Sequence, residues 1–113
     1  MYKLNWKLFL EDILESIELI ESYIADINFD NFKNDRKTID AVVRNLEIIG
    51  ETTNNIPDIV KNKYEDIDWK GMIGLRNRIA HGYFGINLTI IWEIIKKELP
   101  FLKDKMQQIL GKE

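Results

Sequence analysis

The sequence predicts an all-α protein, an antiparallel bundle of four long helices with one additional short helix. Apolar residues recur at helical spacing along most of the chain, and no stretch shows the alternation typical of strands. Six glycines and two prolines punctuate 113 residues, which leaves room for long helices. The length fits a single domain over residues 1–113, and 45% apolar with 31% charged residues is typical of a globular chain.

The first predicted helix covers residues 4–27, because apolar side chains recur along it at helical spacing. Its stripe consists of Trp6, Phe9, Leu10, Ile13, Ile17, Ile20, Ile24 and Ile27. Residues 28–32 are rich in asparagine and aspartate and are predicted as a turn. The second helix begins after Asn34 or Asp35, either of which can cap it. Gly50 lies in its stripe and indicates a close approach of another helix; the other members are Ile39, Val42, Val43, Leu46 and Ile49.

A short third helix is predicted over residues 57–64, because its first residue is a proline. Asp68 can cap a fourth helix, which we expect to stop near Gly82, a residue type favoured just past a helix end. The apolar stripe of this helix consists of Trp69, Met72, Ile73, Ile79, Ala80 and Tyr83. Arg76 falls in the middle of that stripe, whereas Arg78 points the opposite way, where water can solvate it.

Asn87 is predicted to cap a fifth helix, whose inward residues are Leu88, Ile91, Trp92, Ile95 and Leu99. Pro100 is expected to break or kink this helix before a last helical stretch over residues 101–110. Several apolar residues fall off the main stripes, namely Leu8, Leu19, Ile48, Ile90 and Ile94. Such residues on three helices favour a second contact surface, and a two-fold homodimer is the expected assembly. Additional core layers are the alternative.

Composition and charge exclude several classes of site. The sequence has no cysteine, and its single histidine and dispersed carboxylates offer no ligand spacing, so we expect neither a metal ion nor a cofactor. No apolar run reaches the ~20 residues of a membrane span, and no signal-peptide pattern is present, which predicts a cytoplasmic protein without membrane association. The net charge of −3 means that any contact with nucleic acid depends on local basic side chains.

The only histidine lies in residues 76–85, Arg-Asn-Arg-Ile-Ala-His-Gly-Tyr-Phe-Gly. A guanidinium on an apolar face is costly unless an anion meets it, and an imidazole titrates near physiological pH. Arg76, then His81 after four intervening residues, and then Tyr83 form a pattern that resembles the signature of HepT-like proteins in the HEPN superfamily. The similarity covers roughly residues 5–100 and includes the segments 40–51, 55–57, 69–77 and 83–87.

This resemblance implies a HEPN-like fold and a metal-independent ribonuclease with Arg76 and His81 as catalytic residues and Asn77 as a supporting polar residue. It also implies a toxin whose antitoxin is a minimal nucleotidyltransferase of the MNT type. That partner is similar to enzymes that transfer AMP from ATP onto a tyrosine, and Tyr83 occupies the position of the modified tyrosine. The implied substrate is RNA, either tRNA or mRNA.

The residues themselves suit cleavage without a metal ion when two chains combine. RNA cleavage needs a base for the 2′-hydroxyl, an acid for the leaving 5′-oxygen, and positive charge beside the phosphate. Arg76 can hold a phosphate in a bidentate fork, and His81 can transfer a proton. Because one chain has one histidine, a complete acid–base pair requires a second copy across a dimer interface. Glu47 and Glu51 are the candidates to neutralise Arg76 when no phosphate is bound.

Two other functions fit the same residues. The first alternative is a non-catalytic subunit that binds substrate or nucleotide for a minimal nucleotidyltransferase, and the second is a dimeric helical scaffold. His81 is then a surface or capping residue, Arg76 forms a structural ion pair with a glutamate, and Tyr83 is a core aromatic. RNA cleavage that is lost on His81→Ala separates the ribonuclease from the subunit.

Overall fold

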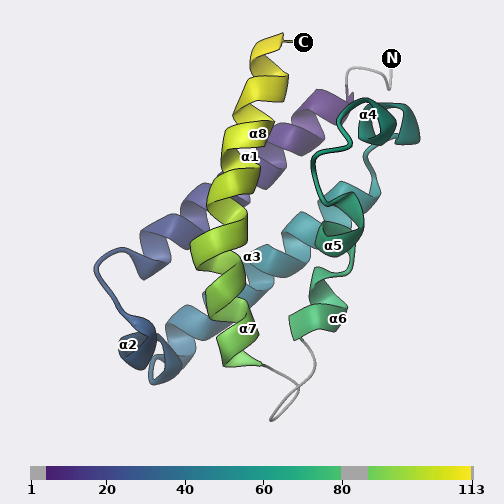
Figure 1. Cartoon of the computed structure of the whole chain (residues 1–113). Coiled ribbons are helices and arrows are strands. Elements are labelled where there is room, and N and C mark those ends of the chain that lie inside the picture. Colours follow the sequence, from purple (N-terminus) through teal and green to yellow (C-terminus); the bar gives the residue numbers. More distant parts are fainter. Residues whose placement is uncertain (1–4, 80–86, 113) are drawn as a thin grey trace.

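The computed structural model describes residues 5–79 and 87–112, and every regular element in these two ranges is a helix (Figure 1). The elements are α1 (Asn5–Ile24), α2 (Phe29–Lys33), α3 (Arg36–Asn54), α4 (Asp58–Lys63), α5 (Trp69–Ile73), α6 (Leu75–Ile79), α7 (Leu88–Glu93), the π-helical turn η3 (Ile94–Glu98) and α8 (Leu99–Lys112). The predicted all-α class is confirmed. None of the helices in the described part combines the length and apolarity needed to cross a bilayer.

The long segments alternate in direction, as an antiparallel bundle requires (Figure 1). α1 packs against α3 and α8, and α3 also packs against α5 and α6. α7, η3 and α8 follow one another as a single rod, while α5 and α6 follow α3 in the opposite direction. The four-helix arrangement with the short α4 therefore agrees with the prediction, and α3 is the element that supports α5 and α6.

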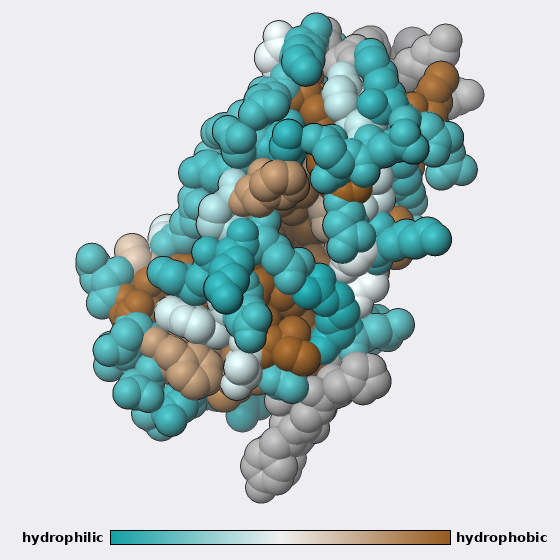
Figure 2. Space-filling view, viewed as in Figure 1, coloured by the Kyte–Doolittle hydropathy of each residue, from teal (hydrophilic) through white to brown (hydrophobic). Residues whose placement is uncertain are grey.

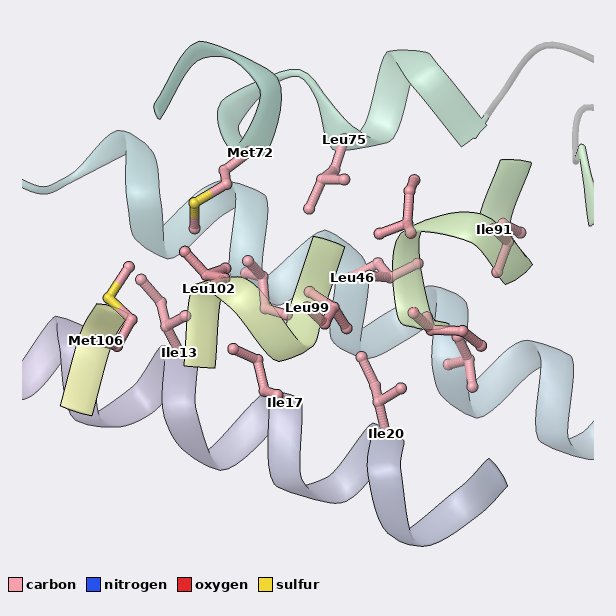
Figure 3. Close-up of a cluster of buried hydrophobic side chains, with 14 of the residues drawn as sticks. Ile13, Ile17, Ile20, Leu46, Met72, Leu75, Ile91, Leu99, Leu102 and Met106 are labelled. Atoms are coloured by element: carbon pink, nitrogen blue, oxygen red, sulfur yellow. The ribbon is translucent and has the colours of Figure 1, made fainter. Parts of the chain in front are cut away.

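Apolar side chains from all of the long segments meet in one core (Figure 3). The side chains at its centre include Ile13, Ile17, Ile20, Leu46, Leu75, Ile91, Leu99, Leu102 and Met106. Complete burial of one such side chain is worth about 1.5–3 kcal/mol relative to leaving it in water. In the described part of the chain, every buried side-chain nitrogen or oxygen has a hydrogen-bond partner. This core fixes the backbone on which the candidate site is built.

The predicted caps begin their helices. The Asp35 carboxylate accepts hydrogen bonds from the Thr38 N–H at 3.1 Å and from the Thr38 hydroxyl at 2.6 Å. The Thr38 hydroxyl bond and the backbone bond lower the pKa of the Asp35 carboxyl. Asp68 accepts from the Gly71 N–H at the start of α5, and Asn87 accepts from the Ile90 N–H at the start of α7.

The structure contains one short helix where a turn was predicted. Residues 28–32 lead into α2, which begins with reciprocal capping: Asn28 accepts from the Asn31 N–H at 2.8 Å, and Asn31 accepts from the Asn28 N–H at 3.4 Å. Phe32 is fully buried, and its ring centroid lies 5.1 Å from that of Trp92. The prediction missed α2 because this single turn is held by a distant aromatic contact as well as by its local caps.

Pro100 does not break the last helix, contrary to one of the two expectations for it. Proline has no N–H, and its ring would clash with the carbonyl four residues earlier in a regular α-helix. The chain instead widens into η3 just before Pro100, and the Leu99 N–H bonds to the Ile94 oxygen five residues back. The helix then continues through α8 to Lys112.

The surface retains part of the predicted second contact face. Leu8 and Leu19 on α1 are exposed, while Ile48 and Ile90 are half-buried. Ile94 was expected off the main stripe, but it is 1% exposed and belongs to the core, because it lies three residues after the buried Ile91 and shares its helical face. The homodimer remains a prediction.

Candidate active site

Arg76 lies on α6 and is exposed, so it does not face the core of this chain as its place in the apolar stripe predicted. The helix that was predicted to begin after Asp68 is interrupted at Gly74, which divides it into α5 and α6. Leu75 occupies the inward position between Met72 and Ile79. Leu75 is 2% exposed and points into the core with Met72 (Figure 3). Arg76 is thereby placed at the edge of the apolar face, where its guanidinium avoids the cost of burial.

Arg76 lines a pocket of about 310 Å³ between α3 and the α5–α6 segment. The α3 side of the pocket consists of Glu47, Gly50, Glu51 and Asn54, which share one helical face, and Ile73 and Arg76 complete the lining. The two glutamates that were candidates to neutralise Arg76 therefore lie in the same pocket. Within the described part of the chain, however, neither of them forms an ion pair with Arg76, whose side chain has no partner there.

Gly50 makes this pocket possible by letting α5 approach α3 closely. A Cβ atom at this position would lie 3.1 Å from the Met72 carbonyl oxygen and 3.6 Å from the Ile73 carbonyl oxygen. The predicted close helix approach is thus confirmed, and the neighbour is the backbone at the end of α5. Because α6 follows directly, the same approach sets the position of Arg76 relative to the α3 glutamates.

Arg78 has a different role from the solvated one that the sequence predicted. Its guanidinium donates to both carboxylate oxygens of Glu98, at 2.9 and 2.5 Å, and so connects α6 to η3. The hydrogen bond to Glu98 raises the pKa of Arg78, and partial burial opposes that effect. The two arginines of α6 therefore differ: Arg78 connects α6 to η3, whereas Arg76 has no partner among the residues that the structure describes.

A second pocket of about 390 Å³ separates α5 and α6 from η3 and α8. Its apolar lining includes Met72, Leu75, Leu99 and Leu102, and the hollow is visible beside α8 in Figure 2. Arg78 and Glu98, which form an ion pair, both line it, and Asp66, also in the lining, pairs with Lys105 of α8 at 2.7 Å. The bond between Lys105 and Asp66 lowers the pKa of the aspartate and raises that of the lysine. The sequence did not predict these pairs, because their members come from distant segments.

Of the other residues of the predicted site, the structure describes Asn77 but not His81 or Tyr83. Asn77 is exposed on α6, beside Arg76 in sequence. His81 and Tyr83 lie outside the described residues. The residues that flank them are joined, because the Asn87 N–H donates to the Ile79 oxygen at 3.1 Å. Ile79 and Asn87 therefore lie together at the end of α6.

No group of three His, Cys, Asp or Glu side chains in residues 5–79 and 87–112 is arranged to hold a metal ion. The pocket between α3 and α6 instead contains one guanidinium, two carboxylates and one amide. The guanidinium can bind an anionic group of a ligand, while the carboxylates and the amide accept hydrogen bonds from N–H donors of the same ligand.

The fold and the site together define the class of protein: an all-α bundle with an exposed arginine on α6. Comparison with protein families identifies it more closely: residues 13–109 match the family described as "Ribonuclease HepT-like". The chain belongs to this family.

Curated relatives support the same assignment over nearly the whole chain. The protein named "Probable ribonuclease HepT" of Thermococcus cleftensis is 42% identical over 107 residues, which cover 95% of this chain and 97% of the relative. A "Putative RNase" of Methanocaldococcus jannaschii is 43% identical over 110 residues, or 97% of this chain and 91% of the relative. One from Caldanaerobacter subterraneus is 41% identical and covers 93% and 94%, respectively. No solved structure matches the chain.

Proposed function

We propose that this protein is an endoribonuclease that cleaves RNA without a metal ion, with Arg76 and His81 as its catalytic residues. Family membership and the names of the relatives support ribonuclease activity. The observation that carries the assignment of Arg76 is its position. It is exposed in a pocket, has no partner in the described part of the chain, and is separated by only three residues from the segment 80–86 that contains His81.

In this mechanism, the 2′-hydroxyl of the RNA attacks the adjacent phosphorus and the bond to the 5′-oxygen breaks, which leaves a 2′,3′-cyclic phosphate. Arg76 donates two hydrogen bonds to the phosphate and stabilises the charge that develops on it. His81 transfers a proton, as a base toward the 2′-hydroxyl or as an acid toward the 5′-oxygen. Asn77 supports the site as a polar neighbour. The second proton-transfer group comes from the His81 of a second copy in a homodimer.

Control of this activity would come from an MNT-type nucleotidyltransferase, with the two proteins forming a toxin–antitoxin pair. The Tyr83 hydroxyl attacks the α-phosphorus of ATP, loses its proton, and releases pyrophosphate, which leaves AMP joined to the tyrosine oxygen. The added phosphodiester is anionic and would compete with the RNA phosphate for Arg76. The target of the active toxin would be tRNA or mRNA.

Cleavage of RNA by purified protein tests the catalytic assignment. Arg76→Ala and His81→Ala are each expected to lower the cleavage rate by ~10²–10⁴, because each removes a group that acts in the transition state. Arg36→Ala is the matched control, since Arg36 is exposed at the far end of α3 and pairs with Asp40 on the surface. The wild-type activity should persist in EDTA. Activity that is lost in EDTA and restored by Mg²⁺ contradicts the metal-free mechanism.

Intact-mass measurement after co-expression with the cognate nucleotidyltransferase tests the control. We expect adducts in steps of one AMP residue on the wild-type protein and none on Tyr83→Phe. Tyr23→Phe, which alters a half-buried tyrosine of α1, should still be modified. Modification that persists in Tyr83→Phe would refute the assignment of this tyrosine. An inert wild-type protein that still binds the nucleotidyltransferase would favour the subunit function instead.

A further inference from the structure

The pocket between α3 and α6 has a charge pattern that suits one part of an RNA substrate. We propose that it binds a guanine base next to the phosphate held by Arg76, and that Glu47 and Glu51 read the N–H donors of that base. The proposal deepens the ribonuclease function and rests on it for the choice of ligand. It begins from the lining of the pocket, which contains one guanidinium, two carboxylates and one amide.

The charges in the pocket suit a ligand that combines an anionic group with hydrogen-bond donors. A second phosphate would be repelled by Glu47 and Glu51, and a ligand that is only cationic would leave Arg76 without an anionic partner. Because neither glutamate pairs with Arg76 in the described part of the chain, the carboxylate oxygens retain their capacity to accept hydrogen bonds. A nucleotide offers what this set requires, since it combines an anionic phosphate with a base that carries N–H donors.

The walls of the pocket also suit a flat ring. Ile73 is half-buried and supplies an apolar wall, and the buried Gly50 forms part of the lining without a side chain of its own. The volume of about 310 Å³ is at the small end of the range for small-molecule sites, which fits one nucleoside rather than a longer segment. Asn54 adds an amide that can donate to a carbonyl or accept from an amine.

Guanine fits the carboxylates better than the other bases do. Its N1–H and N2–H lie side by side and can donate together to the two oxygens of one carboxylate, while Asn54 can donate to its O6. Adenine and cytosine each present one amino group beside an acceptor nitrogen, which a carboxylate repels. Uracil presents one N–H between two carbonyl oxygens and is the poorest match. The pocket should therefore rank guanine first and uracil last.

Binding of 3′-mononucleotides to the full-length protein tests this ranking without relying on cleavage. Isothermal titration is expected to show at least tenfold tighter binding of 3′-GMP than of 3′-UMP. Inosine 3′-monophosphate, which lacks the 2-amino group, should bind more weakly than 3′-GMP. In the double variant that carries both Glu47→Gln and Glu51→Gln, the preference for 3′-GMP over 3′-UMP should fall to about threefold or less. Glu15→Gln on the exposed face of α1 is the matched control and should keep the full preference.

The outcomes separate this proposal from the ribonuclease function. Equal affinity for 3′-GMP and 3′-UMP overturns the proposal even if the protein cleaves RNA, and so does a preference that survives both glutamate substitutions. A preference for 3′-GMP that depends on the glutamates supports it even if no RNA is cleaved. Circular dichroism of the double variant checks the fold. If the double variant is unfolded, the two single substitutions take its place, and at least one of them must show the same loss of preference.

Discussion

Arg76 and Arg78 stand two residues apart on one short helix, and their substitution by alanine should have opposite consequences. Arg76→Ala should change the free energy of unfolding by less than ~0.5 kcal/mol, because the side chain is exposed and unpaired within the described part of the chain. Arg78→Ala removes two hydrogen bonds to Glu98. The Arg78 and Glu98 side chains are 34% and 47% exposed, so solvent screens the pair, and we expect a loss of about 1 kcal/mol.

Urea unfolding followed by circular dichroism measures both changes, and RNA cleavage by the same preparations completes the comparison. Arg76→Ala should lower the cleavage rate by ~10²–10⁴ with its stability intact, whereas Arg78→Ala should stay much closer to the wild-type rate with reduced stability. A double-mutant cycle with Glu98→Ala isolates the pair, and its coupling energy should shrink at high salt. A larger loss of stability in Arg76→Ala than in Arg78→Ala would refute the assignment of one arginine to the ligand and the other to the fold.

Three further results are expected. Ile17→Ala should lower the free energy of unfolding by about 2–5 kcal/mol in urea titrations, because Ile17 is fully buried where α1 meets the core. The Asp35 pKa is lowered in the folded state, so its cap stabilises the protein above the unfolded pKa and is lost as the pH falls through the folded value. The gap in urea midpoint between wild type and Asp35→Ala should therefore close in acid. Sedimentation should give twice the 13.4 kDa chain mass, and a monomer at high micromolar concentration would contradict the dimer.

The features that the sequence predicted correctly depend on short-range patterns. Asp35, Asp68 and Asn87 each bond to an N–H three residues ahead, so the residue type and its place before an apolar stripe were sufficient to locate the start of a helix. The apolar stripe of α1 is continuous, and its residues from Leu10 to Ile24 pack in the core as predicted. Gly50 indicated a close approach, because a residue without a Cβ atom in an apolar stripe leaves room for a neighbouring backbone.

The features that the sequence did not predict depend on contacts between distant segments or on small changes of helical phase. The Arg78–Glu98 pair joins residues twenty positions apart, and no local pattern indicates it. Leu75 was omitted from the predicted stripe, and the interruption at Gly74 makes it an inward residue in place of Arg76. For the site, the sequence indicated Arg76 and its possible glutamate neighbours, but the pocket that contains them required the packing of α3 on α5.

The anchoring of α6 explains how a five-residue helix can carry a functional arginine. A helix of this length is unstable by itself, because nucleation costs more than its few hydrogen bonds return. Here Leu75 and Ile79 are buried in the core, Arg78 is clamped to Glu98, and the Ile79 carbonyl accepts a hydrogen bond from Asn87. Every one of these contacts holds the backbone, and none of them uses the Arg76 side chain. The backbone beneath Arg76 is therefore fixed before a ligand arrives, and only the Arg76 side chain itself remains to be ordered on binding.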